Sequence, residues 1–413
     1  MQAGEQGQKT LEFWFDYTCP YAYLGSVQVR QMARRMGAAL RMCPMLLGGV
    51  FKANGTPQKL FQTIPAPKAA HNASDLARWA ALFQVPPVSF PSEHPMRSVE
   101  ALRATIASGC DPKVIAGFFE AYWQRREHIS SEPVMRRVLE AAGHDASSLI
   151  EAAQSEAIKD ELRARTDRAI GLGIFGAPAY VTSDGHMYWG QDRMHFVAQE
   201  RAEQTMAAIS SPPKGSSVAK HSVELFWDFS SPFAYLGVTQ AQAMAERTGA
   251  QVIFRPMLLG GVFKAIGQAE VPLFTWSDAK RRYYLDDLHR WAAYWGVPFN
   301  FPQTFPMSSI KALRAYLALP EALRADYMHK TFEAYWVHGK DISTDAVLGE
   351  IIGSDASAVL GKTQDPDIKK QLIDATSSAV ERGVFGAPTY IVDGKDLYWG
   401  QDRLPLVERA LSA

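Results

Sequence analysis

Two short stretches of the chain carry side chains suited to thiol or hydroxyl chemistry. Residues 16–25 read DYTCPYAYLG and residues 228–237 read DFSSPFAYLG, so Cys19 and Ser231 hold the same place, each before a proline. A proline in this place is typical of the first position of a helix, which makes Cys19 and Ser231 helix N-caps. The positive helix end favours an anion, so a cysteine there would be biased toward thiolate and a serine could donate to a ligand's thiolate. The alternative is that Ser231 only caps its helix.

A second motif contains a proline at the start of an apolar strand. It reads FGAPAY at 175–180 and FGAPTY at 385–390, which makes Pro178 and Pro388 candidates for cis peptide bonds. If this motif meets the helix start in space, the residue before the proline offers its backbone N–H and C=O groups to an extended, peptide-like ligand.

These motifs belong to an internal repeat that spans most of the chain. PMLLGGVFKA, FEAYW and YWGQDR also occur twice, and the offset between copies drifts only from 212 residues at Cys19 and Ser231 to 210 at the FGAP prolines. So long a match indicates two copies of one whole domain. We expect domains at 1–209 and 223–413, joined by a linker at 210–222 that is rich in proline, glycine and serine.

Each copy has the element pattern of a mixed α/β domain. In the second copy, the periodicity predicts a buried strand at 223–229, a helix from Pro232 to about Thr248 and a strand at 251–258. Residues from about 265 to 380 are mainly helix formers, and an Asp-Gly turn then separates two short strands before a closing helix. The first copy repeats this order.

Composition excludes several classes of partner. The 413 residues include 43 basic and 43 acidic side chains, which gives no electrostatic bias toward nucleic acid or an anionic membrane. The polar N-terminal stretch lacks an apolar signal region and no run is long enough to span a membrane, so we expect a cytoplasmic location. Cys19, Cys43 and Cys110 fit neither a disulfide framework nor a zinc site, and we expect no metal.

Taken together, the Ser-Pro helix start, the GGVFKA segment, the helical insertion and the FGAP and YWGQDR motifs resemble a known family. It comprises 2-hydroxychromene-2-carboxylate isomerases and kappa-class glutathione transferases, the glutathione-using, DsbA-like branch of the thioredoxin superfamily. The resemblance covers both copies nearly end to end. It implies two thioredoxin-like domains, each with an all-helical insertion, and glutathione as the cofactor. Because such enzymes are typically dimers, it also implies an internal pseudo-dimer.

The resemblance assigns roles in the second copy. Ser231 corresponds to the catalytic serine that stabilises the glutathione thiolate. Glutathione would further be bound by Lys264, Ala387, Pro388, Gln401 and Asp402. In this set the lysine meets the glycine carboxylate or the substrate, the alanine pairs with the cysteinyl unit, and the Gln-Asp pair holds the γ-glutamyl end.

On the substrate side, the resemblance points to Tyr284 and Arg290, which match residues that could polarise a carbonyl or carboxylate. Either could instead be ordinary helix surface. Gln268 stands where the isomerases usually have an asparagine, which is a departure from the family pattern.

The first copy keeps the implied glutathione residues and changes the substrate side. The retained residues are Lys52, Ala177, Pro178, Gln191 and Asp192. Asn72 replaces the tyrosine, and Cys19 replaces the serine. Three interpretations of Cys19 follow: a thiolate that forms a mixed disulfide with glutathione, a thiol that donates to it, or an inert residue in a copy without catalysis.

The leading hypothesis for function is a glutathione-dependent isomerase or transferase that acts on an aromatic electrophile, in aromatic-compound breakdown. One alternative is a thiol-disulfide oxidoreductase that uses Cys19. Another is a chain whose first copy is a non-catalytic glutathione-binding or structural partner of the second. A Cys-X-X-Cys pair is missing because Ala22 stands where the second cysteine would fall, which disfavours dithiol oxidation.

Overall fold

The computed structural model describes residues 9–210 and 221–412 and divides into two units. Most of the predicted linker, 211–220, lies outside the described residues. Each unit is built mainly from one copy of the repeat. The first unit also includes one short segment of the second copy, and the second unit also includes one short internal segment of the first copy and, from Arg201 on, the last residues of the predicted first domain. The first unit consists of Met1–Ile64, Ala73–Glu200 and Ser277–Lys280, and the second of Pro65–Asn72, Arg201–Trp276 and Arg281–Ala413.

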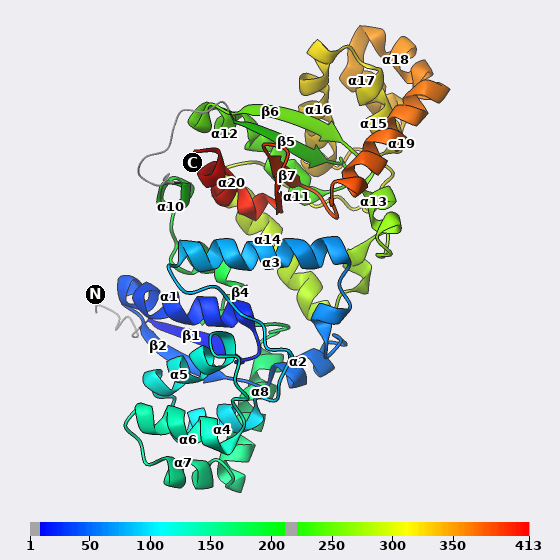
Figure 1. Cartoon of the computed structure of the whole chain (residues 1–413). Helices are drawn as coiled ribbons and strands as arrows, with labels where there is room; N and C mark the ends of the chain where they lie inside the picture. Colours follow the sequence, from blue (N-terminus) through cyan, green and yellow to red (C-terminus); the bar gives the residue numbers. More distant parts are fainter. Residues whose placement is uncertain (1–8, 211–220, 413) are drawn as a thin grey trace, which may run out of the picture. The chain divides into compact units, whose positions relative to one another are not determined.

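A four-stranded mixed sheet forms the centre of the first unit, in the order β2-β1-β3-β4. Figure 1 labels β1, β2 and β4 of this sheet. Strand β1 (Thr10–Phe15) runs parallel to β2 (Ala39–Pro44) and antiparallel to β3 (Ala179–Thr182), which pairs with β4 (Met187–Trp189). Helix α1 (Pro20–Met36) connects the two parallel strands. The apolar side chains of β1 are fully buried, as expected for a central strand covered on both faces.

The second unit repeats this sheet in the order β6-β5-β7-β8. Its strands are β5 (Ser222–Trp227), β6 (Gln251–Pro256), β7 (Thr389–Val392) and β8 (Asp396–Trp399). The predicted Asp-Gly turn joins the last two strands: Asp393 and Gly394 have φ of 49° and 71°, both in the left-handed region, and lie in the turn 393–395 between Val392 and Asp396. The predicted strand, helix, strand, helical insertion and final hairpin are therefore confirmed.

The helix after Ser231 differs in one respect from the prediction. It covers the predicted range but is divided into α11 (Pro232–Thr239) and α12 (Ala241–Thr248), whereas α1 of the first copy is continuous. At the break, the Thr239 hydroxyl donates to the carbonyl of Leu236 at 2.7 Å. Such a side-chain bond competes with the helical backbone pattern and favours an interruption.

An all-helical insertion separates β2 from β3, and another separates β6 from β7, as the sequence predicts. The first contains α2 (Leu47–Ala53), η1 (Leu60–Gln62), α3 (Ala66–Leu82), α4 (Val99–Ala107), α5 (Pro112–Trp123), α6 (Glu132–Ala141), α7 (Ala146–Ala152) and α8 (Glu156–Gly171). After β4 come η2 (Gln191–Arg193), α9 (Met194–Val197) and α10 (Ala202–Ser210).

The second insertion has the same plan. It contains α13 (Leu259–Ala265), η3 (Pro272–Thr275), α14 (Asp278–Trp295), α15 (Ile310–Ala318), α16 (Glu321–Trp336), α17 (Asp345–Ile352), η4 (Gly353–Asp355), α18 (Ala356–Lys362) and α19 (Pro366–Glu381). The chain ends with η5 (Gln401–Arg403) and α20 (Leu404–Leu411). Within the described ranges, no helix has both the length and the apolar character needed to cross a membrane.

Each insertion is attached to its sheet by a buried tryptophan. The indole N–H of Trp123 donates to the carbonyl of Tyr17 at 2.8 Å, and that of Trp336 donates to Phe229 at 2.8 Å. Both acceptors lie just after the central strand, so the FEAYW repeat fixes the helical insertion beside the Cys19 or Ser231 helix start. This bond satisfies the polar atom of a large apolar side chain inside the core.

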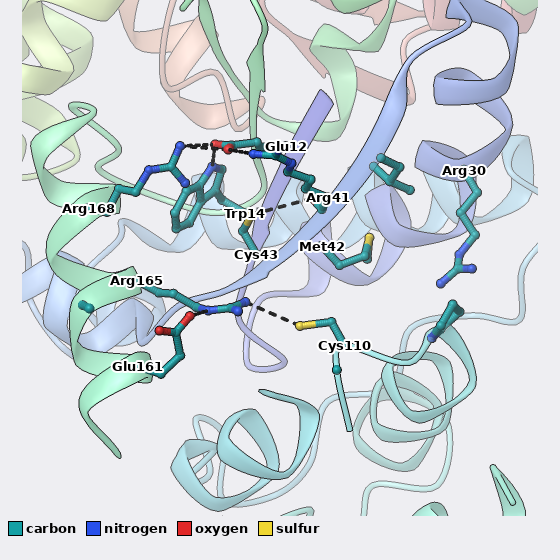
Figure 2. Close-up of a pocket in the computed structure, with 14 residues that line it drawn as sticks. Glu12, Trp14, Arg30, Arg41, Met42, Cys43, Cys110, Glu161, Arg165 and Arg168 are labelled. Atoms are coloured by element: carbon teal, nitrogen blue, oxygen red, sulfur yellow. Dashed lines mark hydrogen bonds and ion pairs between the residues drawn. The ribbon is translucent and has the colours of Figure 1, made fainter. Parts of the chain in front are cut away.

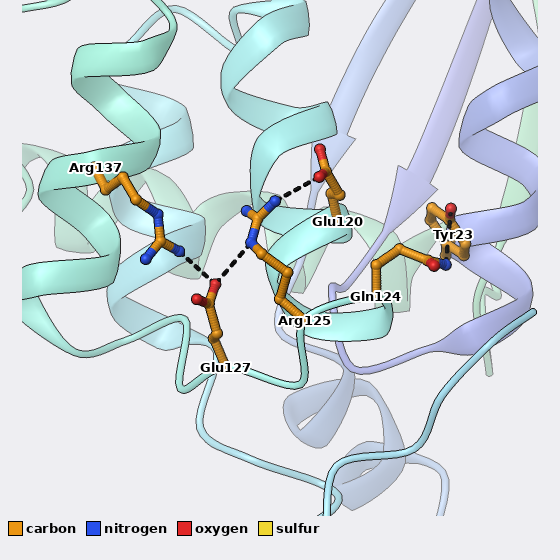
Figure 3. A network of polar contacts seen from close by, with 6 residues as sticks. All are labelled: Tyr23, Glu120, Gln124, Arg125, Glu127 and Arg137. Carbon is orange, nitrogen blue, oxygen red and sulfur yellow. Dashed lines mark hydrogen bonds and ion pairs between the residues drawn. The ribbon is translucent and has the colours of Figure 1, made fainter. Parts of the chain in front are cut away.

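A polar network adds a contact at the surface of the first unit (Figure 3). The side-chain amide of Gln124 donates to the Tyr23 hydroxyl at 3.2 Å and so connects the end of α5 to α1. The same end of α5 is joined to α6 by ion pairs among Glu120, Arg125, Glu127 and Arg137. In the second copy the equivalent Tyr235 donates instead to the carbonyl of Pro298 at 2.6 Å.

Candidate functional site

Ser231 has the position that its motif predicts. It is the N-cap of α11, with proline at the first helical position, and only 4% of its surface is exposed. Its hydroxyl oxygen accepts from the Ala234 N–H at 3.1 Å and donates to the carbonyl of Ala387 at 3.1 Å. The serine therefore caps its helix and also contacts the loop before Pro388, so the two motifs meet in space.

The two FGAP prolines are preceded by cis peptide bonds, as predicted, at Ala177–Pro178 and Ala387–Pro388. The carbonyl of Ala387 is engaged by Ser231, whereas no group in the described part of the chain accepts a hydrogen bond from its N–H. The same holds for Ala177, whose carbonyl is engaged by Cys19. Each loop thus presents one unpaired backbone donor directly before its proline.

Gln401 and Asp402 lie beside the same loop. The Gly400 N–H donates to the carbonyl of Pro388 at 2.9 Å, and the φ of 102° at Gly400 turns the chain into η5. Gln401 is 2% exposed, and its side-chain oxygen accepts from the indole N–H of Trp295 at 2.9 Å. Its side-chain nitrogen is buried and has no hydrogen-bond partner among the described residues. A buried donor of this kind is one that a polar ligand would satisfy.

Tyr390 lies near both Asp402 and the helix that Ser231 begins. Burial raises the pKa of Tyr390, and the nearby charges of Asp402 and Glu408 raise it further. A side chain at Gly237 of α11 would come within 2.6 Å of the Tyr390 hydroxyl, so the glycine allows this close approach. The helix start, the cis-proline loop and the Gln-Asp turn therefore converge at one end of the central strand.

A buried aspartate that sequence reasoning missed holds this arrangement together. Asp228 is fully buried, and its carboxylate accepts from the N–H groups of Ser230 at 2.9 Å and Leu259 at 2.7 Å. Burial raises the pKa of Asp228, which these bonds partly offset. Asp16 does the same in the first copy, binding the Leu47 N–H at 2.9 Å. The sequence contained one indication of this role, because an aspartate begins both copies of the motif.

Aromatic rings adjoin the Ser231 helix start. Tyr284 lies edge-on to Phe233, with ring centroids 6.2 Å apart, and packs on Trp276 with centroids 4.5 Å apart. Because Phe233 follows Ser231 by two residues, the predicted substrate residue Tyr284 is brought to the site.

The other predicted substrate and lysine positions are less closely connected. Arg290 lies over the ring of Tyr283, 5.6 Å from its centroid. Lys264 is exposed in the last turn of α13, and Gln268 follows that helix. Neither Lys264 nor Gln268 makes a side-chain hydrogen bond or ion pair to another described residue, so their predicted roles remain predictions.

His71 is a residue of the second unit for which the sequence gave no signal. It lies in α3, and its Nε2 accepts from the backbone N–H of Trp399 at 3.1 Å. Its ring packs against Phe385, with centroids 5.5 Å apart. Because Nε2 accepts, the proton of the neutral ring is on Nδ1. His71 therefore supports both the FGAP and the YWGQDR motifs.

The first copy has the same geometry with sulfur in place of oxygen. Cys19 is the N-cap of α1 and is 7% exposed, and its thiol donates to the carbonyl of Ala177 at 3.0 Å. Burial raises the pKa of the Cys19 thiol to about 12, and the N–H groups of Tyr21 and Ala22 only partly oppose this. The predicted bias toward thiolate is therefore wrong here, because desolvation outweighs the helix N-terminus.

The remaining glutathione positions of the first copy parallel the second. The Gly190 N–H donates to the carbonyl of Pro178 at 2.9 Å, Gln191 is 3% exposed, and its side-chain nitrogen is without a partner among the described residues. Asp192 pairs with Arg193 at 3.0 Å, as Asp402 pairs with Arg403 at 3.3 Å. Lys52 is exposed in the last turn of α2.

Two further observations concern metals and thiols. All three cysteines are free. In the described ranges there is no group of three or more His, Cys, Asp or Glu side chains placed to hold a metal ion.

Comparison with known proteins explains why the same site occurs twice. A model of the DSBA-like thioredoxin domain matches residues 10–201 and again residues 222–412. The chain belongs to this family. Its two DSBA-like domains follow one another in tandem, each with its own four-stranded sheet and helices.

Curated relatives of this DSBA-like chain are enzymes. A 2-hydroxychromene-2-carboxylate isomerase of Pseudomonas putida is 31% identical over 194 residues, which are 46% of this chain and 93% of the relative. Glutathione S-transferase kappa 1 of Rattus norvegicus is 28% identical over 220 residues, or 50% of this chain and 95% of the relative. A solved 2-hydroxychromene-2-carboxylate isomerase is similar with 30% identity and a TM-score of 0.41, covering 46% of this chain and 94% of that one. Each relative thus has about the length of one domain.

Proposed function

We propose that the chain is a glutathione-dependent isomerase or transferase for an aromatic electrophile, with Ser231 as the catalytic residue of the second domain. The observation that carries the proposal is the position of the Ser231 hydroxyl, which caps α11 and at the same time reaches the cis-proline loop at 3.1 Å. A buried hydroxyl there can turn its proton toward an incoming thiolate, close to the positive end of a helix.

The residues around Ser231 fit glutathione. The Ala387 N–H has no acceptor among the described residues and is a backbone donor of the kind that an extended peptide uses, and its C=O, which also accepts from Ser231, is the matching acceptor. The buried side-chain nitrogen of Gln401, which has no partner among the described residues, is a donor for a carboxylate, and the carboxylate of Asp402 is an acceptor for an ammonium group. These groups would hold the cysteinyl and γ-glutamyl parts, and Lys264 the glycine carboxylate.

When bound, glutathione would supply a thiol nucleophile that adds reversibly to a conjugated carbonyl compound. The protein's own contribution is to bind, orient and stabilise charge. Ser231 donates to the developing thiolate, and Asp228 fixes the strand end from which Ser231 follows. The rings of Phe233, Tyr284 and Trp276 offer an apolar, aromatic surface beside the serine for the electrophile.

For the first domain, the geometry favours a thiol that donates. Cys19 makes the same contact to Ala177 that Ser231 makes to Ala387, and its raised pKa keeps the thiol protonated near neutral pH. A thiol-disulfide oxidoreductase needs a thiolate nucleophile. We therefore propose that this domain binds glutathione through a protonated Cys19, and we place the oxidoreductase alternative second.

The proposal retains three further expectations from the sequence. They are the division into domains at 1–209 and 223–413, an internal pseudo-dimer of these domains, and a cytoplasmic location. The free state of all three cysteines is consistent with a reducing compartment.

One experiment tests the function directly. The full chain is mixed with glutathione and 2-hydroxychromene-2-carboxylate, and the absorbance spectrum is followed, with 1-chloro-2,4-dinitrobenzene as a parallel transferase substrate. We expect turnover of one of these compounds that depends on glutathione and on Ser231. Absence of glutathione binding in calorimetric titration would overturn the proposal. Binding of two glutathione molecules per chain is expected, whereas one would contradict the role assigned to the first domain.

A further inference from the structure

The first unit contains a cavity whose lining is rich in arginine (Figure 2). Its volume is about 680 Å³, within the range of small-molecule sites. The polar lining residues are Glu12, Arg30, Arg41, Cys43, Cys110, Glu161, Arg165 and Arg168, and the apolar ones include Trp14, Leu40, Met42 and Pro112. None of Cys19, Ala177 and Gln191 lines it, so this cavity is distinct from the candidate glutathione site.

The charges in the lining do not balance. Four arginines face two carboxylates, which leaves an excess of two positive charges. Arg168 is bound to Glu12 at 2.8 Å, and Arg165 is bound to Glu161 at 2.7 Å. Both carboxylates of the lining are therefore already bound closely to one arginine each.

The remaining two arginines have weaker partners or none. Arg41 is 4.0 Å from Glu12, which already holds Arg168. Arg30 forms no side-chain hydrogen bond or ion pair with any described residue. Burial lowers the pKa of Arg30, and the nearby charge of Asp111 partly opposes this effect. The Asp111 carboxylate, however, is bound to His144 at 2.9 Å. The cavity therefore has cationic groups available for a ligand.

Arg165 is held in a fixed orientation across the cavity. Its Nε donates to Glu161 and its Nη1 donates to the Cys110 sulfur at 3.4 Å, as Figure 2 shows. Arg168 is held by its hydrogen bond to Glu12. Its guanidinium also lies over the ring of Trp14, 5.1 Å from the ring centroid. Arginines that are already oriented lose little conformational freedom when they bind an anion.

The second copy shows that the fold does not require these arginines. Arg41 pairs with Glu12 in the strand register, and the residue that pairs with the equivalent Glu224 is Ile253. Cys43 likewise corresponds to Arg255, which binds Glu224 directly at 2.8 Å.

The arginines on the helices that line the cavity are also absent from the second copy. Thr166 and Thr376 are equivalent because each accepts from the backbone at the start of the helix after β2 or β6. This alignment places Ala375 and Ser378 at the positions of Arg165 and Arg168. Gly37 and Gly249 are equivalent because each ends its helix in the left-handed conformation. Alignment on these two glycines places Gln242 at the position of Arg30. None of the four arginines is retained, although the architecture is.

We propose that this cavity of the first domain binds a small organic anion with two or more negative charges, a dicarboxylate or a phosphate monoester. Arg30 and the weakly paired Arg41 supply positive charge, and Arg165 supplies an oriented guanidinium for a carboxylate or phosphate. The apolar side chains of Leu40, Met42 and Pro112 contact the carbon skeleton. At the positions of these four arginines the second domain has uncharged residues, and its own Arg255 and Arg382 are both bound to Glu224.

The test uses the full chain without glutathione, so that glutathione itself does not contribute, and the variants and thiol readout below separate this cavity from the empty glutathione sites. Succinate, citrate and glycerol 3-phosphate are titrated, and the unfolding temperature is compared with that in sodium chloride of equal ionic strength. We expect a saturable rise with at least one of these anions. The carboxylate and phosphate arms distinguish the two kinds of ligand. No rise beyond that of sodium chloride would overturn the proposal.

Two variants locate the binding. Arg30→Gln combined with Arg41→Ile introduces the residues of the second copy, which the same architecture accommodates. We expect the apparent affinity to fall about tenfold or more, since two charged contacts are lost. Arg163→Ala is the control, because Arg163 is 68% exposed on the same helix as Arg165, pairs with Asp160 and is not part of the lining. Equal losses in both proteins would indicate non-specific screening and refute the site.

A thiol readout tests the location without a variant. Cys110 and Cys43 line the cavity and Cys19 does not. The anion that raises the unfolding temperature should slow alkylation of Cys110, measured peptide by peptide with mass spectrometry, and leave the rate at Cys19 unchanged. Equal protection of Cys19, or none at Cys110, would contradict binding in this cavity.

Discussion

The hydroxyl oxygen of Ser231 lies 3.1 Å from the carbonyl oxygen of Ala387, although 156 residues separate the two in the sequence. This bond joins the start of a helix to the loop that contains the cis-proline. Cys19 and Ala177 form the equivalent contact at 3.0 Å in the first domain. The side chain at the N-cap therefore decides which donor, a hydroxyl or a thiol, each domain presents beside the loop.

Replacement of Ser231 by alanine should reduce activity far more than stability. The change removes the donor proposed for the glutathione thiolate, so we expect kcat of the glutathione-dependent reaction to fall about 10²–10³-fold. The lost helix cap should cost about 1 kcal/mol of the free energy of unfolding. Steady-state kinetics and urea denaturation measure the two effects.

Thr344→Ala is the matched control for that variant. Thr344 caps α17 in the same domain, with its hydroxyl accepting from the Val347 N–H at 3.4 Å. It should lose a similar amount of stability and keep its activity. If Ser231→Ala retained full activity, the serine would be a structural cap only.

The Cys19 thiol should titrate well above an ordinary thiol. Because its pKa is about 12, the alkylation rate of Cys19 by iodoacetamide should rise about tenfold per pH unit from pH 7 to 10 without reaching a plateau. The pKa of Cys19 in the folded protein is above its value of 9.0 in the unfolded chain. The contribution of the protonated thiol to the free energy of unfolding is therefore present below about pH 9 and is lost as the pH rises toward 12.

The measurement is mass spectrometry of the Cys19 peptide at each pH, with the chain unfolded in urea as the reference. The reference should level off near the ordinary thiol pKa. A plateau below pH 8 in the folded protein would instead support the thiolate interpretation of Cys19.

Gly386→Ala should destabilise the second domain. The added methyl group would overlap the indole nitrogen of Trp399 and lie 3.0 Å from Cε2 of the same ring. Such overpacking typically costs about 1–3 kcal/mol, which urea denaturation would measure.

Gly361→Ala serves as the control, because Gly361 lies in helix α18 and an added methyl group there meets nothing within 4 Å. This change should be neutral or stabilise by up to about 1 kcal/mol, as alanine is the better helix former. If both variants were equally stable, the close packing of Trp399 on the FGAP loop would be disproved.

Acid should weaken the second domain partly through Glu224. Hydrogen bonds from Arg382 lower the pKa of this carboxyl against the opposing effect of burial, and Arg255 lowers it further. The folded-state pKa is below the unfolded value of about 4.5, so this contribution to stability is present above that pH and is lost as the pH falls.

Glu224→Gln should therefore lose less stability than the original chain between about pH 5 and 3. Glu381→Gln, which changes an exposed carboxyl in the same domain, should leave the pH dependence unchanged. Urea denaturation at a series of pH values measures both slopes. Parallel curves for Glu224→Gln and the original chain would show that the ion pairs of Glu224 with Arg255 and Arg382 do not contribute to the pH dependence of stability.

Local patterns in the sequence determined much of the fold. The repeated motifs, the proline after Ser231, the alternation of strands and helices and the Asp393-Gly394 turn each reflect backbone preferences that act over a few residues. Because those preferences agree with the tertiary structure, the N-caps, the cis-prolines at Pro178 and Pro388 and the order of elements could be predicted.

Only the tertiary structure decided the environment of the side chains. The helix start alone predicts a Cys19 thiolate, but the surrounding core removes water from the thiol and raises its pKa. Trp295 and Gln401 are 106 residues apart, and His71 and Trp399 are 328 apart, yet each pair is hydrogen-bonded. Desolvation and such contacts depend on residues distant in the chain, which is also why the four arginines of the first-domain cavity become a group only after folding.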